Sequence, residues 1–391
     1  MSKSDITMIN DNSVDGLKDH LADNEIYKNL RRHSPLLAFI LLIFLPLLLF
    51  FFNITCTLRH PIVESFQHVH DMFIFDVDCL AIVLGWLLIQ SAFFSLIRKQ
   101  YYHHNGIIAF VFSLGGVYIL NWFEIIHASY IYDNIHKILV ASIIVSYFIG
   151  LLLFIKGNET RYLKQINPIV AFFYGTDINL TITGIDLKLF FELRIGLIGW
   201  ACLNLCFFLK TIELYTYRRP PAFVLVVIQQ ILQALQLIWY EDIRLRNNNT
   251  KKETIGFIHI FGSLCWFPFL WCLPSQYLIL VNYPIKRLYI IVSVILFLLG
   301  MFISRRSIHY QQEISSKKNT KSYGLISLIS NYWTLCRHPY YLGICLLEYI
   351  FMMISFLLFR KFANTYFLDN TLRLNAYSMD VTFILSASYL Q

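Results

Sequence analysis

The stretch PLLAFILLIFLPLLLFFFN, residues 35–53, contains no charged side chain. An α-helix needs about 20 predominantly apolar residues to cross the hydrocarbon core of a bilayer. Residues 35–53 meet that requirement in length and in composition. They therefore predict a transmembrane helix near the start of the chain.

Further apolar stretches follow along the chain and predict the same kind of element. They are 79–97, 107–126, 136–155, 195–209, 220–240, 256–281 and 288–304, with 338–359 as a segment that spans or folds back. The fold class predicted is all-α, a polytopic transmembrane bundle of about 8–10 helices. The predicted organisation is a cytosolic N-terminal segment (1–34), a multi-span membrane domain (35–360) and a short C-terminal tail (361–391).

The composition excludes a soluble domain. The 391 residues are 57% hydrophobic and only 14% charged, whereas soluble domains are about 25% charged. A soluble protein of this length could not remove so much apolar surface from water. The net charge of +8 has no compact basic domain to carry it, so no nucleic acid partner is expected. The eight cysteines match no zinc-binding spacing, so no metal is expected.

Basic residues lie at alternate ends of the predicted spans. Lys28, Arg31 and Arg32 precede the first span, and Arg305 and Arg306 follow the stretch 288–304. The positive-inside rule then places the N-terminus and the segment after residue 304 in the cytosol. The loop with Lys210, Arg218 and Arg219 does not fit this pattern. Residues 1–34 lack the features of a signal peptide, so the first span is expected to act as an uncleaved anchor.

A first polar cluster stands at the mouth of a predicted span. It contains Asp186, Lys188, Glu192 and Arg194. Ionisable groups there are costly unless they are paired or face water, which makes them candidates for a functional site. An interfacial belt of ion pairs that anchors the helix is the alternative interpretation.

A second cluster closes the predicted span 220–240. Trp239 and Tyr240 are followed by Glu241 and Asp242. A carboxylate next to apolar residues can have a raised pKa and act as a proton donor. The alternative is an ordinary aromatic belt with charged caps.

A third cluster combines cations with aromatic rings. It contains Trp333, Arg337, His338, Pro339 and Tyr341. An arginine fork and a helix N-terminus both suit a phosphate or pyrophosphate group, and a snorkelling arginine is the alternative. No dinucleotide-binding or phosphate-binding glycine motif occurs, so any nucleotide would be bound without one.

Four stretches resemble the membrane sterol reductases, a family that includes the delta-14-sterol reductases, the 7-dehydrocholesterol reductases and the C-terminal half of the lamin B receptor. They are AFFYGTDIN (171–179), DLKLFFELRIGLIGW (186–200), GSLCWFPFLW (262–271) and CRHPYYLG (336–343). The resemblance covers roughly residues 100–345 and is most specific from Asp186 to Trp200.

The resemblance implies a ten-helix protein of the endoplasmic reticulum membrane, continuous with the nuclear envelope. It implies NADPH-dependent reduction of a sterol ring double bond, with the delta-14 bond favoured, in which a proton adds first and a hydride follows. Glu241 is the implied catalytic residue, and Trp239 and Tyr240 are implied to bind the sterol. The implied cofactor contacts are Arg305, Trp333, Arg337, His338 and Tyr341. The implied partners are a sterol and the lipid bilayer.

The chain departs from the family pattern at several polar positions. Tyr340 replaces an Asn of the C-terminal signature, and Gln233 and Gln236 replace a Tyr and an Asp before Trp239. A neutral Gln cannot donate a proton as an acid does. These departures support an alternative, a catalytically impaired sterol-binding or nuclear-envelope relative. A methyltransferase of the isoprenylcysteine type rests on RHPYYLG alone, and the match at 171–200 argues against it.

Overall fold

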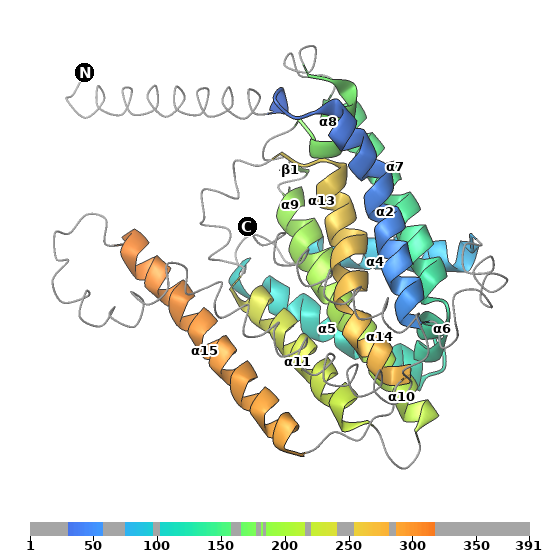
Figure 1. The fold of residues 1–391 in the computed structure, drawn as a ribbon, viewed down its shortest axis with the longest axis vertical. Helices are drawn as coiled ribbons and strands as arrows, with labels where there is room; N and C mark the ends of the chain where they lie inside the picture. The colour runs from blue at the N-terminus through green and yellow to red at the C-terminus, as the bar shows by residue number, and fades with distance from the viewer. Residues whose placement is uncertain are drawn as a thin grey trace, which may run out of the picture.

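The protein is described here from a computed structural model, and its helices form one bundle (Figure 1). The structure describes residues 30–57, 75–96, 102–157, 166–176, 181–182, 185–215, 220–240, 254–280 and 287–316. The predicted N-terminal segment up to residue 29, the predicted segment 338–359 and the predicted tail lie outside these residues.

The first four long helices cover the first four predicted spans. They are α2 (Pro35–Thr57), α4 (Val77–Leu96), α5 (Tyr102–Trp122) and α7 (Ile135–Gly157), with the short helix α6 (Ala128–Asp133) before α7. Exposed leucine, isoleucine and phenylalanine side chains run along them, as expected for surfaces that face lipid. Their buried sides join a single apolar core.

The centre of the bundle comes from the second half of the chain. One run consists of α9 (Leu187–Leu189), the π-helix η3 (Phe190–Leu197) and α10 (Ile198–Leu214), and α11 (Pro221–Trp239) follows it. A second run consists of α13 (Phe257–Phe261), the π-helix η5 (Gly262–Leu270) and α14 (Leu273–Leu280). The long helix α15 (Arg287–Ser316) lies beside α11 at the edge (Figure 1).

The predicted fold class is confirmed. Within the described residues, seven helices or helix runs are long and apolar enough to cross a membrane. The predicted stretch 288–304 forms part of α15, which is not one of these seven, so its role as a span stays a prediction. The chain is thus a polytopic helical membrane protein, with a single pair of two-residue strands among the described residues, β1 (Thr181–Ile182) and β2 (Ile185–Asp186).

Two predicted boundaries were wrong for physical reasons. The span predicted at 195–209 is a helix run from Leu187 to Leu214, because its charged residues lie within the helix. The span predicted at 107–126 ends at Trp122. Glu124 takes a positive φ of 57°, which breaks the helix, although the residues after it are still apolar.

The π-helices η3 and η5 pack directly against each other. Gly196 lets the two backbones approach, since a Cβ added there would lie 3.1 Å from the Ser263 carbonyl oxygen. Pro268 lies inside η5, and a proline cannot supply the amide that a regular helix uses at that position. A π-helical segment accommodates such a break, and single-turn π-bulges often occur at functional sites.

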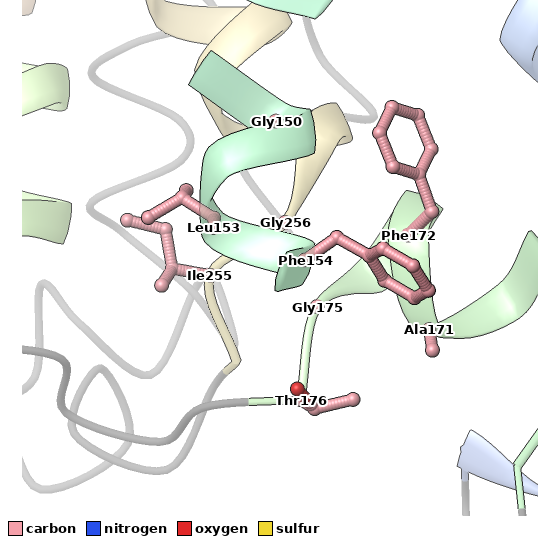
Figure 2. Close-up of a pocket in the computed structure, with 9 residues that line it drawn as sticks. All are labelled: Gly150, Leu153, Phe154, Ala171, Phe172, Gly175, Thr176, Ile255 and Gly256. Carbon is pink, nitrogen blue, oxygen red and sulfur yellow. The ribbon is translucent and has the colours of Figure 1, made fainter. Parts of the chain in front are cut away.

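Two glycines fix the crossing of the chain at the end of the bundle where η3 and α13 begin. The helix α8 (Pro168–Tyr174) starts at the cap Asn167, whose Oδ1 accepts from Ile169 N at 3.0 Å. It ends at Gly175, with φ at 81°, where the chain passes against Gly256. Figure 2 shows both glycines in a crevice beside α7. Thr254 strengthens the crossing by donating from its Oγ1 to the Tyr174 carbonyl oxygen at 2.8 Å.

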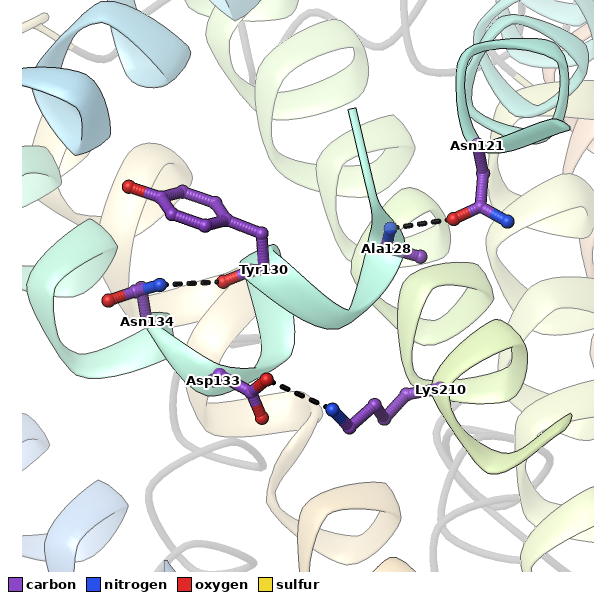
Figure 3. Close-up of polar contacts among 6 residues, drawn as sticks. All are labelled: Asn121, Ala128, Tyr130, Asp133, Asn134 and Lys210. Atoms are coloured by element: carbon purple, nitrogen blue, oxygen red, sulfur yellow. Dashed lines mark hydrogen bonds and ion pairs between the residues drawn. The ribbon is translucent and has the colours of Figure 1, made fainter. Parts of the chain in front are cut away.

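The opposite end of the bundle accounts for Lys210, one of the three basic residues that did not fit the charge pattern; Arg218 and Arg219 lie outside the described residues. Lys210, near the end of α10, pairs with Asp133 at the end of α6, with Nζ to Oδ2 at 2.9 Å (Figure 3). Asn121 on α5 accepts from the Ala128 amide at 2.7 Å and holds the start of α6. The charge of Lys210 is therefore compensated by an acidic neighbour from another helix.

The glycine crossing yields a stability prediction. A Cβ added at Gly256 would lie 2.2 Å from the Gly175 nitrogen, so Gly256→Ala must displace backbone. We expect a loss of about 2 kcal/mol or more, seen as a clearly lower thermal unfolding temperature of the purified protein in detergent.

Gly85→Ala is the matched control for this prediction. Gly85 lies in α4, and an added Cβ there meets nothing within 4 Å. Alanine is the better helix former, so the unfolding temperature should stay the same or rise. Equal stability of the two variants would contradict the close crossing.

Candidate functional site

The predicted site residues that the structure describes lie on two neighbouring helices, α11 and α15. Trp239 is the last residue of α11, Tyr240 caps it, and Arg305 lies on the neighbouring helix α15. The other predicted residues, Glu241, Trp333, Arg337, His338 and Tyr341, lie outside the described residues. Their roles stay predictions.

The charge of Arg305 on α15 acts on the Tyr240 hydroxyl, whereas Trp239 faces outward. Partial burial raises the pKa of the Tyr240 hydroxyl, and the nearby charge of Arg305 opposes that rise. Tyr240 is therefore a neutral phenol at neutral pH and can donate a hydrogen bond. Trp239 is 63% exposed and lies on the outer face of α11. Tyr240 and Arg305 thus offer a hydrogen-bond donor and a positive charge on adjacent helices.

A row of buried glutamines leads from this point into the bundle. Gln229, Gln233 and Gln236 follow helical spacing on α11 and are all buried. Gln229 Nε2 donates to Ser293 Oγ at 3.3 Å, and Gln236 Nε2 donates to Ser304 Oγ at 2.7 Å. We call Gln229, Gln233 and Gln236 with their two serines the α11–α15 seam. It connects α11 and α15 through neutral polar groups.

In the sequence, Gln233 and Gln236 stand out only as departures from a motif, and neither Gln229 nor the two serines was predicted. A signal was present, because glutamines at 229, 233 and 236 in an apolar helix define one polar face. The partner helix could not be read from that spacing.

A second buried network joins three central helices. Ser275 Oγ on α14 lies 2.6 Å from Asn204 Oδ1 on α10 and 2.8 Å from Gln230 Oε1 on α11, and it donates to one of them at a time. Gln230 Nε2 donates to the Trp271 carbonyl oxygen at 2.9 Å. Asn204 Nδ2 donates to the Trp200 carbonyl oxygen at 3.0 Å. The amide oxygens therefore point toward Ser275, which links the three helices.

Arg194, from the first polar cluster, lies inside the bundle. Its side chain is 1% exposed, and its guanidinium lies 5.8 Å from the centre of the Phe94 ring. Residues 187–214 form one apolar helix run, so this charge is held within a span. Arg194 is thus enclosed by the protein and does not face water, and both interpretations of the cluster stay predictions. Lys188 and Glu192 are only partly buried.

The crevice at the glycine crossing does not include the predicted site residues. It is lined by Gly150, Leu153, Phe154, Ala171, Phe172, Gly175, Thr176, Ile255 and Gly256 (Figure 2). None of its side chains carries a charge. Its position beside α7 and α8 makes it a packing feature of the crossing. No group of three metal-ligating side chains occurs among the residues that the structure describes.

The fold and the polar groups inside it define a class, the polytopic helical membrane proteins with a buried polar face. The model of the ergosterol biosynthesis ERG4/ERG24 family matches residues 52–370, which is most of the chain. The chain belongs to this family, as the sequence resemblance predicted.

Curated relatives include several sterol reductases. The chain is 27% identical over 346 residues to the "Delta(14)-sterol reductase LBR" of Gallus gallus, which covers 78% of the chain and 53% of that protein. It is 31% identical over 255 residues to the Delta(14)-sterol reductase of Methylotuvimicrobium alcaliphilum, covering 62% of the chain and 60% of that protein. It is 25% identical over 274 residues to the 7-dehydrocholesterol reductase of Arabidopsis thaliana, covering 62% of each. The chain spans about half to three fifths of the length of these relatives.

The network around Ser275 yields a second stability prediction. Ser275→Ala removes the donor that serves Asn204 Oδ1 and Gln230 Oε1, both of which are buried. Hydrogen bonds between helices in membranes contribute up to about 1.7 kcal/mol, and a stranded polar atom adds to the loss. The unfolding temperature in detergent should fall by a few degrees.

Ser95→Ala serves as the control. Ser95 is exposed on α4 and donates only to the Ser91 carbonyl oxygen of its own helix, at 2.8 Å. Its removal should leave the unfolding temperature within about a degree of the wild type. If Ser275→Ala behaved in the same way, the network would not stabilise the bundle.

Proposed function

We propose that this chain is a sterol reductase that saturates a ring double bond, with the delta-14 bond as its target. The observation that carries the proposal is the family match over residues 52–370, together with relatives named Delta(14)-sterol reductase. One of the relatives is a 7-dehydrocholesterol reductase, so a different ring double bond is the alternative target. A membrane-embedded bundle suits a substrate that dissolves in lipid.

The reaction needs an acid in an apolar pocket and a hydride donor. A proton adds to one carbon of the double bond, and a hydride quenches the resulting cation at the other. NADPH supplies that hydride when it is bound. We assign the proton to the region of Glu241, which directly follows Tyr240. Tyr240 is a neutral phenol with a cation nearby, so it can orient a polar group beside the acid.

The basic residues on α15 support a phosphate-bearing cofactor. Arg305 and Arg306 are both exposed at the end of the apolar part of α15, where a water-soluble cofactor can reach them. Arginine forks bind phosphate oxygens in pairs. The proposed cofactor site also includes four residues that are assigned from the sequence alone: Trp333, Arg337, His338 and Tyr341. The positive-inside rule puts this end of α15 in the cytosol, and the proposed membrane is that of the endoplasmic reticulum and nuclear envelope.

A catalytically impaired relative is the second candidate, and one observation favours it. Gln233 and Gln236 occupy positions where the family usually has a Tyr and an Asp, and both are buried amides in the α11–α15 seam. An amide does not supply a proton at neutral pH. Such a protein would bind a sterol within the same fold without reducing it.

Complementation separates the two candidates. The chain is expressed in a yeast strain without delta-14-sterol reductase, and membrane sterols are profiled by mass spectrometry. We expect the 8,14-diene to disappear and its reduced product to accumulate. Persistence of the diene, with the folded protein present in membranes, would favour the impaired relative, and a 7-dehydrosterol substrate would then test the other ring position.

Arg305→Ala tests the cofactor side of the proposal. Loss of a charged phosphate contact should raise the KM for NADPH about tenfold or more, with the KM for sterol nearly unchanged. The measurement is NADPH oxidation by purified protein with saturating sterol.

Arg287→Ala is the matched control for the cofactor test. Arg287 is an exposed arginine at the other end of α15, across the predicted membrane from Arg305. Its removal should leave both KM values unchanged. If Arg305→Ala left the KM for NADPH unchanged, Arg305 would not be part of the cofactor site.

A further inference from the structure

The middle of the α11–α15 seam differs from its two ends. Gln229 and Gln236 each donate to a serine on α15, with Nε2 to Oγ distances of 3.3 Å and 2.7 Å. Between those serines, the buried residues of α15 that the structure describes are Phe297 and Gly300. Neither has a side chain that forms hydrogen bonds. The seam therefore has polar partners at its ends and an apolar partner in its middle.

The hydrogen bonds fix the direction in which one end amide points. Ser304 Oγ donates its single proton to the Met301 carbonyl oxygen at 3.1 Å. Ser304 must then accept from Gln236 Nε2, so Gln236 Oε1 is left as an acceptor. Gln229 is arranged in the same way, with its Nε2 on Ser293. In the described part of the chain, neither Oε1 atom has a donor.

Gln233 lies one helical turn from each of these amides and is 4% exposed. Its Oε1 also has no hydrogen-bond donor among the described residues. A buried amide without a partner costs about 1–3 kcal/mol, and native proteins seldom keep one without a use. Three acceptor oxygens thus follow one face of α11 within a membrane span. That arrangement calls for a donor from outside the described helices.

The chemistry of the seam restricts what such a ligand can be. Three acceptors require a donor, which excludes a ketone or an ester. The seam contains no charged side chain between residues 229 and 236, so burial would disfavour an ammonium group. A hydroxyl group both donates and accepts hydrogen bonds. It can therefore donate to the Gln233 amide oxygen or accept from the amide nitrogen.

The face of α11 beside the seam is apolar and exposed, as a surface that meets the bilayer is. Ile228 and Leu232 flank the glutamines on α11 and are 49% and 40% exposed, on the surface that faces lipid. Phe297 offers an apolar wall at the middle of the seam. A ligand that enters here must dissolve in lipid and bring a hydroxyl with it. Lipid-soluble alcohols with a rigid apolar body fit both conditions.

We propose that Gln233, with the amide oxygens of Gln229 and Gln236 on either side, binds the hydroxyl group of a sterol. The choice of a sterol rests on the proposed function, whereas the need for a hydroxyl rests on the seam alone. Gln233 acts here as a binding residue that selects sterols over steroid hydrocarbons, which lack the hydroxyl.

A binding experiment with a sterol and its hydroxyl-free hydrocarbon counterpart tests the assignment. The purified full chain in lipid–detergent micelles is loaded with tritiated cholesterol, and unlabelled cholesterol or cholest-5-ene, which lacks the hydroxyl, competes for the site. For the wild type we expect cholest-5-ene to compete about five- to tenfold more weakly, the worth of one buried hydrogen bond. In Gln233→Met, whose new side chain is apolar and of similar length, the two competitors should displace the labelled cholesterol equally well.

Leu232→Met is the matched control, because it changes the neighbouring lipid-facing residue of the same helix. It should keep the wild-type preference for the hydroxylated sterol. Thermal unfolding without sterol gives a second readout. Gln233→Met should be as stable as the wild type or more stable, since it removes a buried amide that has no partner among the described residues.

Specific outcomes would overturn the assignment. Equal competition by cholesterol and cholest-5-ene in the wild type would do so, and so would a preference for cholesterol that survives in Gln233→Met. The assignment would also fail if the folded protein bound no sterol, or if Gln233→Met were clearly less stable than the wild type. The experiment measures binding and no turnover. If the protein fails complementation but prefers the hydroxylated ligand, the proposed reductase function is rejected and this site is retained. If it complements without that preference, the reductase function is retained and this site is rejected.

Discussion

Polar groups inside a membrane span must find partners within the protein, and the Ser275 hydroxyl meets that constraint at the centre of the bundle. It lies between Asn204 Oδ1 at 2.6 Å and Gln230 Oε1 at 2.8 Å, so α10, α11 and α14 meet at one side chain. Water is absent from the hydrocarbon core, and a polar group without a partner there costs several kcal/mol. The position of α11, and with it the α11–α15 seam, depends on this contact.

Close backbone packing supplies the second constraint. The π-helices η3 and η5 approach at Gly196, and Gly175 and Gly256 let two segments cross where a side chain would collide with backbone. Without a hydrophobic driving force between helices in lipid, small residues at interfaces allow van der Waals contact. This packing also encloses Arg194, whose guanidinium lies over the Phe94 ring.

The seam gives one face of α11 a neutral polar character inside the bundle. The sequence resemblance predicts a Tyr and an Asp where this chain has Gln233 and Gln236, and both glutamines are buried. Tyr240 on α11 and Arg305 on α15 follow at the end of the same two helices. Amides on this face can donate and accept hydrogen bonds, but they cannot supply a proton at neutral pH.

The sequence by itself determined the membrane spans, because the length and apolarity of a stretch such as 35–53 are local properties. It also determined the family, through the motif at 186–200. Tertiary structure alone decided that Arg194 is buried, that Lys210 meets Asp133, and that Gln229 and Gln236 of α11 donate to serines of α15. Each of these depends on which helices become neighbours, and hydropathy along a chain does not determine that, because the bilayer provides no hydrophobic driving force between particular helices.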